Sequence, residues 1–161
     1  MSRVFGIDPG TARLGYGVLD EARGGRVDVV TFGVITTEPG EVGRRLNRLF
    51  DDLEALLAET RPDVAAVEQL FFGQNTTTAL GVSQARGVAL LALARAGVTI
   101  REVTPSQVKQ AVAGWGRADK RQVQAMVARL LSLSAVPEPD DAADALAVAW
   151  SALGGREGRA P

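Results

Sequence analysis

The chain opens with the stretch VFGIDPGTARLGYGVL (residues 4–19), which indicates how a sheet begins. The apolar run over residues 4–8 predicts a strand that the following Pro-Gly pair ends. Residues 14–19 predict a second strand and residues 27–35 a third. Because short connections join antiparallel neighbours, these three segments predict a β-meander.

After the meander, the apolar residues change their period. Over residues 41–59 they recur every three or four positions, which predicts an amphipathic helix. Residues 64–67 and 98–103 predict two more strands, with a helix over residues 77–96 between them. A helix that joins two strands implies a right-handed crossover, so the fourth strand is expected beside an earlier strand and parallel to it. Shorter helices are predicted over residues 105–113, 119–132 and 141–153.

The expected architecture is α/β, with a mixed five-stranded sheet that has helices on its faces. A length of 161 residues suits one domain. We expect this domain to cover residues 1–153 and residues 154–161 to form a flexible, glycine-rich tail.

The composition excludes several kinds of chemistry. The chain has no cysteine and no histidine, which excludes disulfides, thiolate or imidazole metal sites and the Ser-His-Asp triad. Any metal must therefore bind oxygen ligands, which favours magnesium, manganese or calcium. No stretch approaches the roughly 20 apolar residues of a membrane span, and the N-terminus does not resemble a signal peptide. We expect a cytoplasmic protein that makes no membrane contact.

Charge is unevenly distributed, although the net charge is only −1. Residues 84–130 carry eight basic and two acidic side chains, whereas residues 38–68 carry four basic and eight acidic ones. Both lysines, Lys109 and Lys120, fall within the basic block. Such segregation creates a local field that suits a phosphate-bearing partner, although a solvated helical face has the same composition.

Four carboxylates fall at three places that the fold brings together. Asp8 ends the first predicted strand and Glu68 follows the fourth, so parallel pairing places both at the carboxyl edge of the sheet. Asp141 and Asp144 are three residues apart on the last predicted helix and share a face. Taken alone, Asp8 also suits a turn, and the helical acids suit capping roles. Glu68 follows an apolar strand and needs a cation or donors nearby, and two divalent ions about 4 Å apart could support phosphodiester hydrolysis.

Several motifs resemble those of the RuvC family of Holliday-junction resolvases, and they follow the family order over residues 4–152. They are GIDPGT (residues 6–11), GYG (15–17), VEQLF (67–71), QARGVA (84–89), PSQVKQ (105–110), KRQVQ (120–124) and DAADALA (141–147).

The resemblance implies a ribonuclease H-like fold and a homodimeric endodeoxyribonuclease that nicks two opposing strands of a four-way DNA junction in recombination and repair. It implies Mg²⁺, or Mn²⁺, with two ions in each active site. The four catalytic and metal-binding acids of the family correspond to Asp8, Glu68, Asp141 and Asp144. The preceding acid, Asp140, is an alternative to Asp141 by spacing alone, while the match to DAADALA favours Asp141.

The resemblance and the basic block also predict DNA-binding residues. Lys109 and Lys120 match family lysines near the scissile phosphate, and Phe71 matches an aromatic that stacks on an opened base. Arg86 and Arg121 are further candidates from the basic block. The implied partners are the four-way junction, a second copy of the chain, and the RuvA and RuvB branch-migration proteins.

Other functions remain open from the sequence. The GIDPGT motif also resembles the phosphate-binding hairpin of actin-like sugar kinases, which would make the chain a nucleotide-binding phosphotransferase. Those kinases are about two domains long, and no second hairpin is evident here. A non-catalytic junction-binding module would lack one of the four acids, and a ribonuclease of the same fold would differ in substrate only.

Overall fold

A computed structural model describes residues 1–69 and 76–153 of the chain. The strands are β1 (Ser2–Asp8), β2 (Arg13–Glu21), β3 (Val27–Thr36), β4 (Val64–Glu68) and β5 (Thr99–Val103). The helices are α1 (Val42–Thr60), α2 (Thr76–Arg95), α3 (Pro105–Ala113), α4 (Lys120–Leu130) and α5 (Asp140–Ser151). The predictions for Phe71 and for a flexible tail over residues 154–161 lie outside the described residues.

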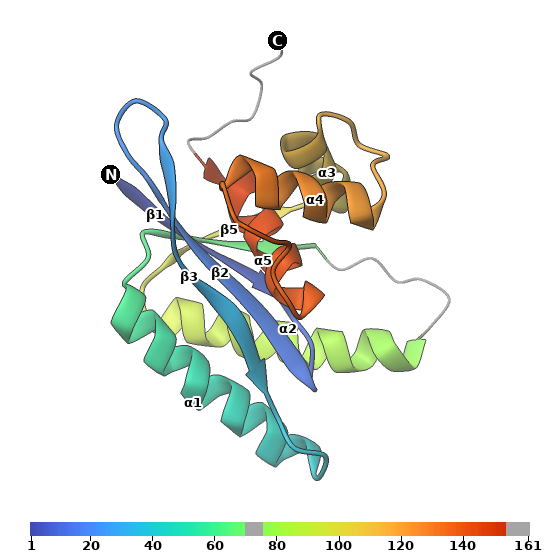
Figure 1. Ribbon diagram of the computed structural model, residues 1–161. Coiled ribbons are helices and arrows are strands. Elements are labelled where there is room, and N and C mark those ends of the chain that lie inside the picture. The colour runs from blue at the N-terminus through green and yellow to red at the C-terminus, as the bar shows by residue number, and fades with distance from the viewer. Residues whose placement is uncertain (70–75, 154–161) are drawn as a thin grey trace.

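The five strands form one mixed sheet in the order β3-β2-β1-β4-β5 (Figure 1). Antiparallel pairing joins β1 to β2 and β2 to β3, which confirms the predicted meander. β4 pairs with β1 in parallel, and β5 pairs with β4 in parallel. Consequently β1, β4 and β5 all end at the same edge of the sheet, here called the carboxyl edge.

Helices cover both faces of the sheet. On one face, α1 and α2 pack large side chains such as Leu53 and Leu93 against Phe5 and Ile7 of β1. On the other face, α5 lies across β1 and β2, and α3 and α4 pack outside it (Figure 1). The two apolar clusters are separated by the sheet, so each face has its own core.

Helix α5 lies unusually close to the sheet because the strands below it carry glycines. A Cβ atom at Gly6 would clash with the backbone oxygen of Ala145, and one at Gly15 would clash with that of Asp141. Gly17, opposite Gly6 in the β1–β2 ladder, leaves room for Leu146. These three glycines, here called the glycine floor, allow an alanine-rich helix to contact the strand backbone.

The predicted elements are all present, with shifts at their ends. The helix predicted over residues 119–132 ends at Leu130, because Ser132 has a φ of 54° in the left-handed region. Asp119 is its N-cap and forms a capping box with Gln122, as the sequence predicts. Within the described ranges, no helix has the length and apolarity needed to cross a membrane.

Candidate active site

Asp8 and Glu68 lie next to each other in register at the carboxyl edge. Ile7 pairs with Val67 in the parallel β1–β4 ladder, and each acid is the next residue along its strand. Their side chains point to the face that α5 covers, because the residues before them, Ile7 and Val67, point into the opposite core. The predicted placement of the two acids at one edge is confirmed.

Helix α5 brings two more acids to this edge. Asp144 lines a cavity of about 250 Å³ together with Asp8 and Glu68, and Lys109 and Lys120 line the same cavity. Asp141 lies one turn earlier on α5, where its backbone rests on Gly15 of the glycine floor. Since Gly15 is the ladder partner of Asp8, the last helix is held directly above the end of β1.

The carboxylates at this cavity oppose one another's ionisation. Burial, followed by the negative charges of Asp144, Asp141 and Glu68, raises the pKa of Asp8 to about 8. Burial, followed by the charge of Asp144, also raises the pKa of Glu68, while Lys109 acts in the opposite direction. The site is therefore short of positive charge.

Lys120, the first residue of α4, supplies part of that charge. Its Nζ atom is 2.8 Å from Oδ2 of Asp140 and 3.0 Å from Oδ2 of Asp144. The hydrogen bond to Asp140 is the main reason that the pKa of Lys120 is raised, and the same bond lowers the pKa of Asp140. Gln124, one turn later on α4, donates from Nε2 to Oδ1 of Asp144 at 3.2 Å.

Asp140 and Asp141 occupy different surroundings. The side chain of Asp140 is 50% exposed and pairs with Lys120 at the surface. The side chain of Asp141 is 25% exposed, and its Oδ2 lies 3.2 Å from Nε of Arg13. That Oδ2 atom is buried and accepts no hydrogen bond from the described part of the chain, since the Arg13 contact is close but poorly aligned. Asp141 therefore has a buried oxygen that accepts no hydrogen bond from the described residues and has the Arg13 charge near it, whereas Asp140 is paired with Lys120 at the surface.

The predicted DNA-binding residues divide into two groups. Lys109 and Lys120 line the cavity, and Arg121 is exposed on the first turn of α4. Arg86 on α2 has a side chain that is only 18% exposed and pairs with Glu102 of β5. Its Nε also donates to the backbone oxygen of Glu68 at 3.4 Å, so it ties α2 to the end of β4.

The residue types and their crowding suit a divalent cation, although no ready-made site is present. In residues 1–69 and 76–153, no three acidic side chains converge as a metal-binding group. Lys120 instead bridges Asp140 and Asp144 at the edge of the cavity. The buried free oxygen of Asp141 and the raised pKa of Asp8 both indicate that additional positive charge would be accommodated here.

Three contacts of the site were not predicted from the sequence, namely those of Arg13, Asp140 and Gln124. Gln124 follows Lys120 by four residues, so a shared helix face was a usable signal. Arg13 begins the strand whose Gly15 pairs with Asp8, but the sequence alone does not place α5 above it. The pairing of Asp140 with Lys120 depends on how α4 and α5 pack.

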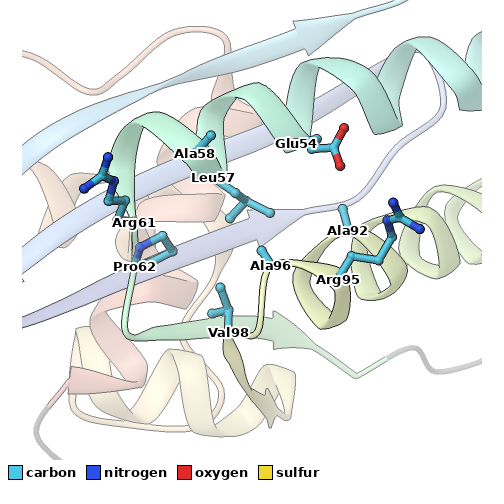
Figure 2. A pocket seen from close by; sticks show the side chains of 9 residues that line it. All are labelled: Glu54, Leu57, Ala58, Arg61, Pro62, Ala92, Arg95, Ala96 and Val98. Atoms are coloured by element: carbon cyan, nitrogen blue, oxygen red, sulfur yellow. The ribbon is translucent and has the colours of Figure 1, made fainter.

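A different cavity, of about 760 Å³, lies between the C-terminal ends of α1 and α2 (Figure 2). Its apolar wall includes Leu57, Ala92 and Val98, and Arg61 and Arg95 are among its charged side chains. The two helices end here, shortly before β4 and β5 begin, so this cavity is at the sheet edge opposite the carboxylates. Of the predicted site residues that the structure describes, none lines it.

Comparison with known proteins shows the family of the chain. Residues 4–152 match the family model described as crossover junction endodeoxyribonuclease RuvC. The chain belongs to the RuvC family. Nucleases of this family depend on metal ions. The match spans every element of the sheet and α5.

Relatives within the RuvC family are similar over nearly their whole length. The crossover junction endodeoxyribonuclease RuvC of Heliobacterium modesticaldum is 56% identical over 148 residues, which cover 91% of this chain and 90% of the relative. The structure of T. thermophilus RuvC in complex with a Holliday junction substrate is 37% identical, with a TM-score of 0.86, and the similarity covers 94% of this chain and 92% of that one.

A more distant structure shares the fold alone. The yeast mitochondrial Holliday junction resolvase Ydc2 is 15% identical, with a TM-score of 0.67 over 93% of this chain and 78% of that one. The ribonuclease H-like architecture predicted from the sequence is confirmed. Membership of the RuvC family decides against the actin-like phosphotransferase.

Proposed function

We propose that this chain resolves four-way DNA junctions by paired, symmetric nicks on opposing strands, as part of DNA recombination and repair. The observation that carries the proposal is the gathering of Asp8, Glu68 and Asp144 in one cavity with Lys109 and Lys120, in a chain of the RuvC family. Acids next to lysines suit the hydrolysis of a phosphodiester, since the acids can hold cations and the lysines can face phosphate. We infer that residues 1–153 act as one nuclease domain in the cytoplasm.

Asp8, Glu68, Asp141 and Asp144 are the residues that would hold divalent metal, with Mg²⁺ or Mn²⁺ as the ion and two ions in each site. The fit rests on oxygen-only ligands, the buried oxygen of Asp141 that accepts no hydrogen bond from the described residues, and the burial and crowding that raise the pKa of Asp8. When bound, such ions supply charge stabilisation and an activated water for in-line displacement. The free oxygen of Asp141 and the surface pairing of Asp140 support Asp141 as the ligand.

Lys120 has a separate role in this proposal. It neutralises Asp144 in the described arrangement and lies at the mouth of the cavity, where a DNA phosphate would arrive. Lys109 faces the same cavity and offsets the charge of Glu68. Both lysines and Arg121 would contact phosphates. We retain Phe71 as a candidate for base stacking and Arg86 as a candidate for DNA binding. Arg86 also donates a hydrogen bond to the backbone oxygen of Glu68 at the end of β4.

Symmetric cleavage requires two copies of the cavity, and α2 offers a surface for a second copy of the chain. Leu80 and Leu91 of α2 are 64% and 55% exposed. Gly87 lies between them along the helix, and a Cβ there would meet no atom within 4 Å. With Gln84 and Ala94, these residues recur at alternating spacings of four and three, which is the pattern of a helix–helix seam.

The experiment that tests the function is a cleavage assay. A mobile four-way junction, a linear duplex and a single strand of the same sequence are compared with and without Mg²⁺ or Mn²⁺. We expect paired nicks in the junction only when metal is present. Equal cleavage of single-stranded DNA, or no cleavage of the junction, would contradict the proposal.

The dimer and the partners have their own tests. Sedimentation should give the mass of two chains for the wild type and of one chain for Leu91→Glu, because a charge would enter the seam. The RuvA and RuvB proteins should increase cleavage of a junction that must migrate to reach a cleavable sequence. A wild type that sediments as one chain would contradict the dimer.

A further inference from the structure

The loop between α3 and α4 forms one wall of the carboxylate cavity. It covers residues 114–119, and its Ala118 and Asp119 line the cavity together with Asp8 and Lys120. Gly116 of the same loop packs against the Oγ atom of Ser106, next to Pro105, which also lines the cavity. The end of the loop at Ala118 and Asp119 is therefore beside the carboxylates.

The loop is fixed at both ends. Gly114 adopts a left-handed φ of 83°, and its backbone N–H donates to the oxygen of Gln110 at 3.0 Å. The side chain of Gln110 donates back to the oxygen of Gly114, also at 3.0 Å. Ala118 is only 1% exposed, and Asp119 is the N-cap of α4. The loop therefore has the contacts of an ordered segment rather than a free one.

This ordered loop carries a large aromatic side chain that faces water. Trp115 is 49% exposed, whereas the other tryptophan of the chain, Trp150, is 9% exposed and donates from Nε1 to the backbone oxygen of Ala111. A tryptophan is usually well buried, and packing does not account for Trp115. The exposed side chain of Arg117 is on the same loop, and Lys120 follows it.

An exposed indole followed by two cationic residues, Arg117 and Lys120, on an ordered loop that lines the carboxylate cavity, has the chemistry of a nucleotide contact. Aromatic rings stack on nucleobases without sequence preference, while neighbouring basic groups bind the phosphates. We propose that Trp115 stacks on an unpaired nucleobase of the DNA strand that enters the carboxylate cavity. This inference rests on the proposed function and assigns Trp115 as a binding residue on the loop that lines the carboxylate cavity.

Binding of an uncleaved four-way junction in EDTA tests the proposal. The variants are Trp115→Ala, Trp115→Phe and the matched control Leu130→Ala, which removes another exposed apolar side chain, 37% exposed, from the far end of α4. We expect Trp115→Ala to weaken junction binding about tenfold, because a base stack of typical strength is lost. Trp115→Phe should bind within about twofold of the wild type, and Leu130→Ala should bind like the wild type.

Linear duplex distinguishes stacking from other contacts. Its bases remain paired and stacked, so Trp115→Ala should bind duplex as the wild type does. An equal loss on duplex and junction would overturn base stacking. An equal loss in the alanine and phenylalanine variants would overturn it as well, because phenylalanine keeps an aromatic face.

Fluorescence gives a direct readout, because the chain has two tryptophans. The junction should quench the emission of the wild type, whereas Trp115→Phe, which retains only the buried Trp150, should not respond. Unchanged wild-type emission during saturable binding would overturn the inference. If the wild type neither binds nor cleaves the junction, the proposed function itself has failed, so the two failures are distinguishable.

Discussion

The two faces of the sheet are built on different principles. On the face that α1 and α2 cover, Phe5, Ile7 and Leu14 of the strands pack against large side chains of the helices, such as Leu53. Toward α5 the strands present the glycine floor, so helix backbone contacts strand backbone. Side chains set the spacing on the first face, and main chain sets it on the second.

The acids are on the face with the closer spacing. Asp141 and Asp144 are carried by α5, and Asp8 and Glu68 extend from the strands toward it. Because main-chain contact leaves little room for repacking, the separation of the acids is fixed by the fold. The α1–α2 face provides much of the buried apolar surface and has no part in the cavity. The comparison implies that cleavage depends mainly on the α5 face, whereas both faces contribute to stability.

The largest effect on cleavage is expected at the acids themselves. Asp8→Asn should reduce junction cleavage on the order of a thousandfold or more, because ligands of one centre act as a unit. The same change should raise the melting temperature of the metal-free protein at neutral pH, because the neutral amide avoids the cost of folding a carboxyl group whose pKa is raised by burial and by three other acids. Cleavage assays and thermal unfolding in EDTA check the two effects, and a lower melting temperature would contradict the crowding argument.

The next largest effect is expected at the glycine floor. Gly15→Ala places a Cβ against the backbone of Asp141, which forces α5 away from the sheet. We expect a stability loss of about 1–3 kcal/mol and a fall in cleavage of about a hundredfold, because misplacement by about 1 Å is costly for catalysis. Urea denaturation and single-turnover cleavage measure both effects. Full cleavage in a stably folded variant would show that α5 can move freely.

The opposite result is expected on the other face. Leu53→Ala removes a fully buried side chain from α1 and should cost about 2–5 kcal/mol of stability. Cleavage well below the melting temperature should remain within about threefold of the wild type, since α5 and the strands below it are untouched. A loss of cleavage as large as that of Gly15→Ala would show that the two faces are not independent.

The smallest effect is expected at the start of β1, at the end of the strand opposite Asp8. Arg3 contacts Asp20 through Nε and Oδ1 and through Nη2 and Oδ2, each at 2.7 Å. The hydrogen bond from Arg3 lowers the pKa of Asp20. Asp20→Asn should cost about 1 kcal/mol at pH 7 and leave cleavage unchanged.

The sign of the pH dependence follows from the lowered pKa. The pair stabilises the protein fully above the ordinary pKa of aspartate, and its contribution is lost as the pH falls through the lowered pKa of the folded state. Urea denaturation of the wild type and of Asp20→Asn should therefore converge in acid. A constant difference at all pH values would contradict the ion pair as the cause.

The sequence predicted the strand order of the meander and the meeting of Asp8 and Glu68 because both depend on local periodicity and parallel pairing. It did not predict the partners of Lys120 and Asp141, because these depend on how α4 and α5 pack against the sheet. Nor did it predict that Arg86, which stays a candidate for DNA binding, pairs with Glu102 of β5. That contact requires β5 to lie beside β4, which no local pattern specifies.

The glycine floor also bears on how such an enzyme can change over evolutionary time. A Cβ atom at Gly6, Gly15 or Gly17 would clash with α5, so we expect selection to remove most substitutions at these three positions. The 114–119 loop, by contrast, forms one wall of the cavity through Ala118 and Asp119. Its largest side chain, Trp115, is exposed, so a substitution there disturbs few neighbours. Substitutions that alter substrate choice can therefore accumulate on the 114–119 loop, while the distance between the acids of α5 and those of the strands stays the same.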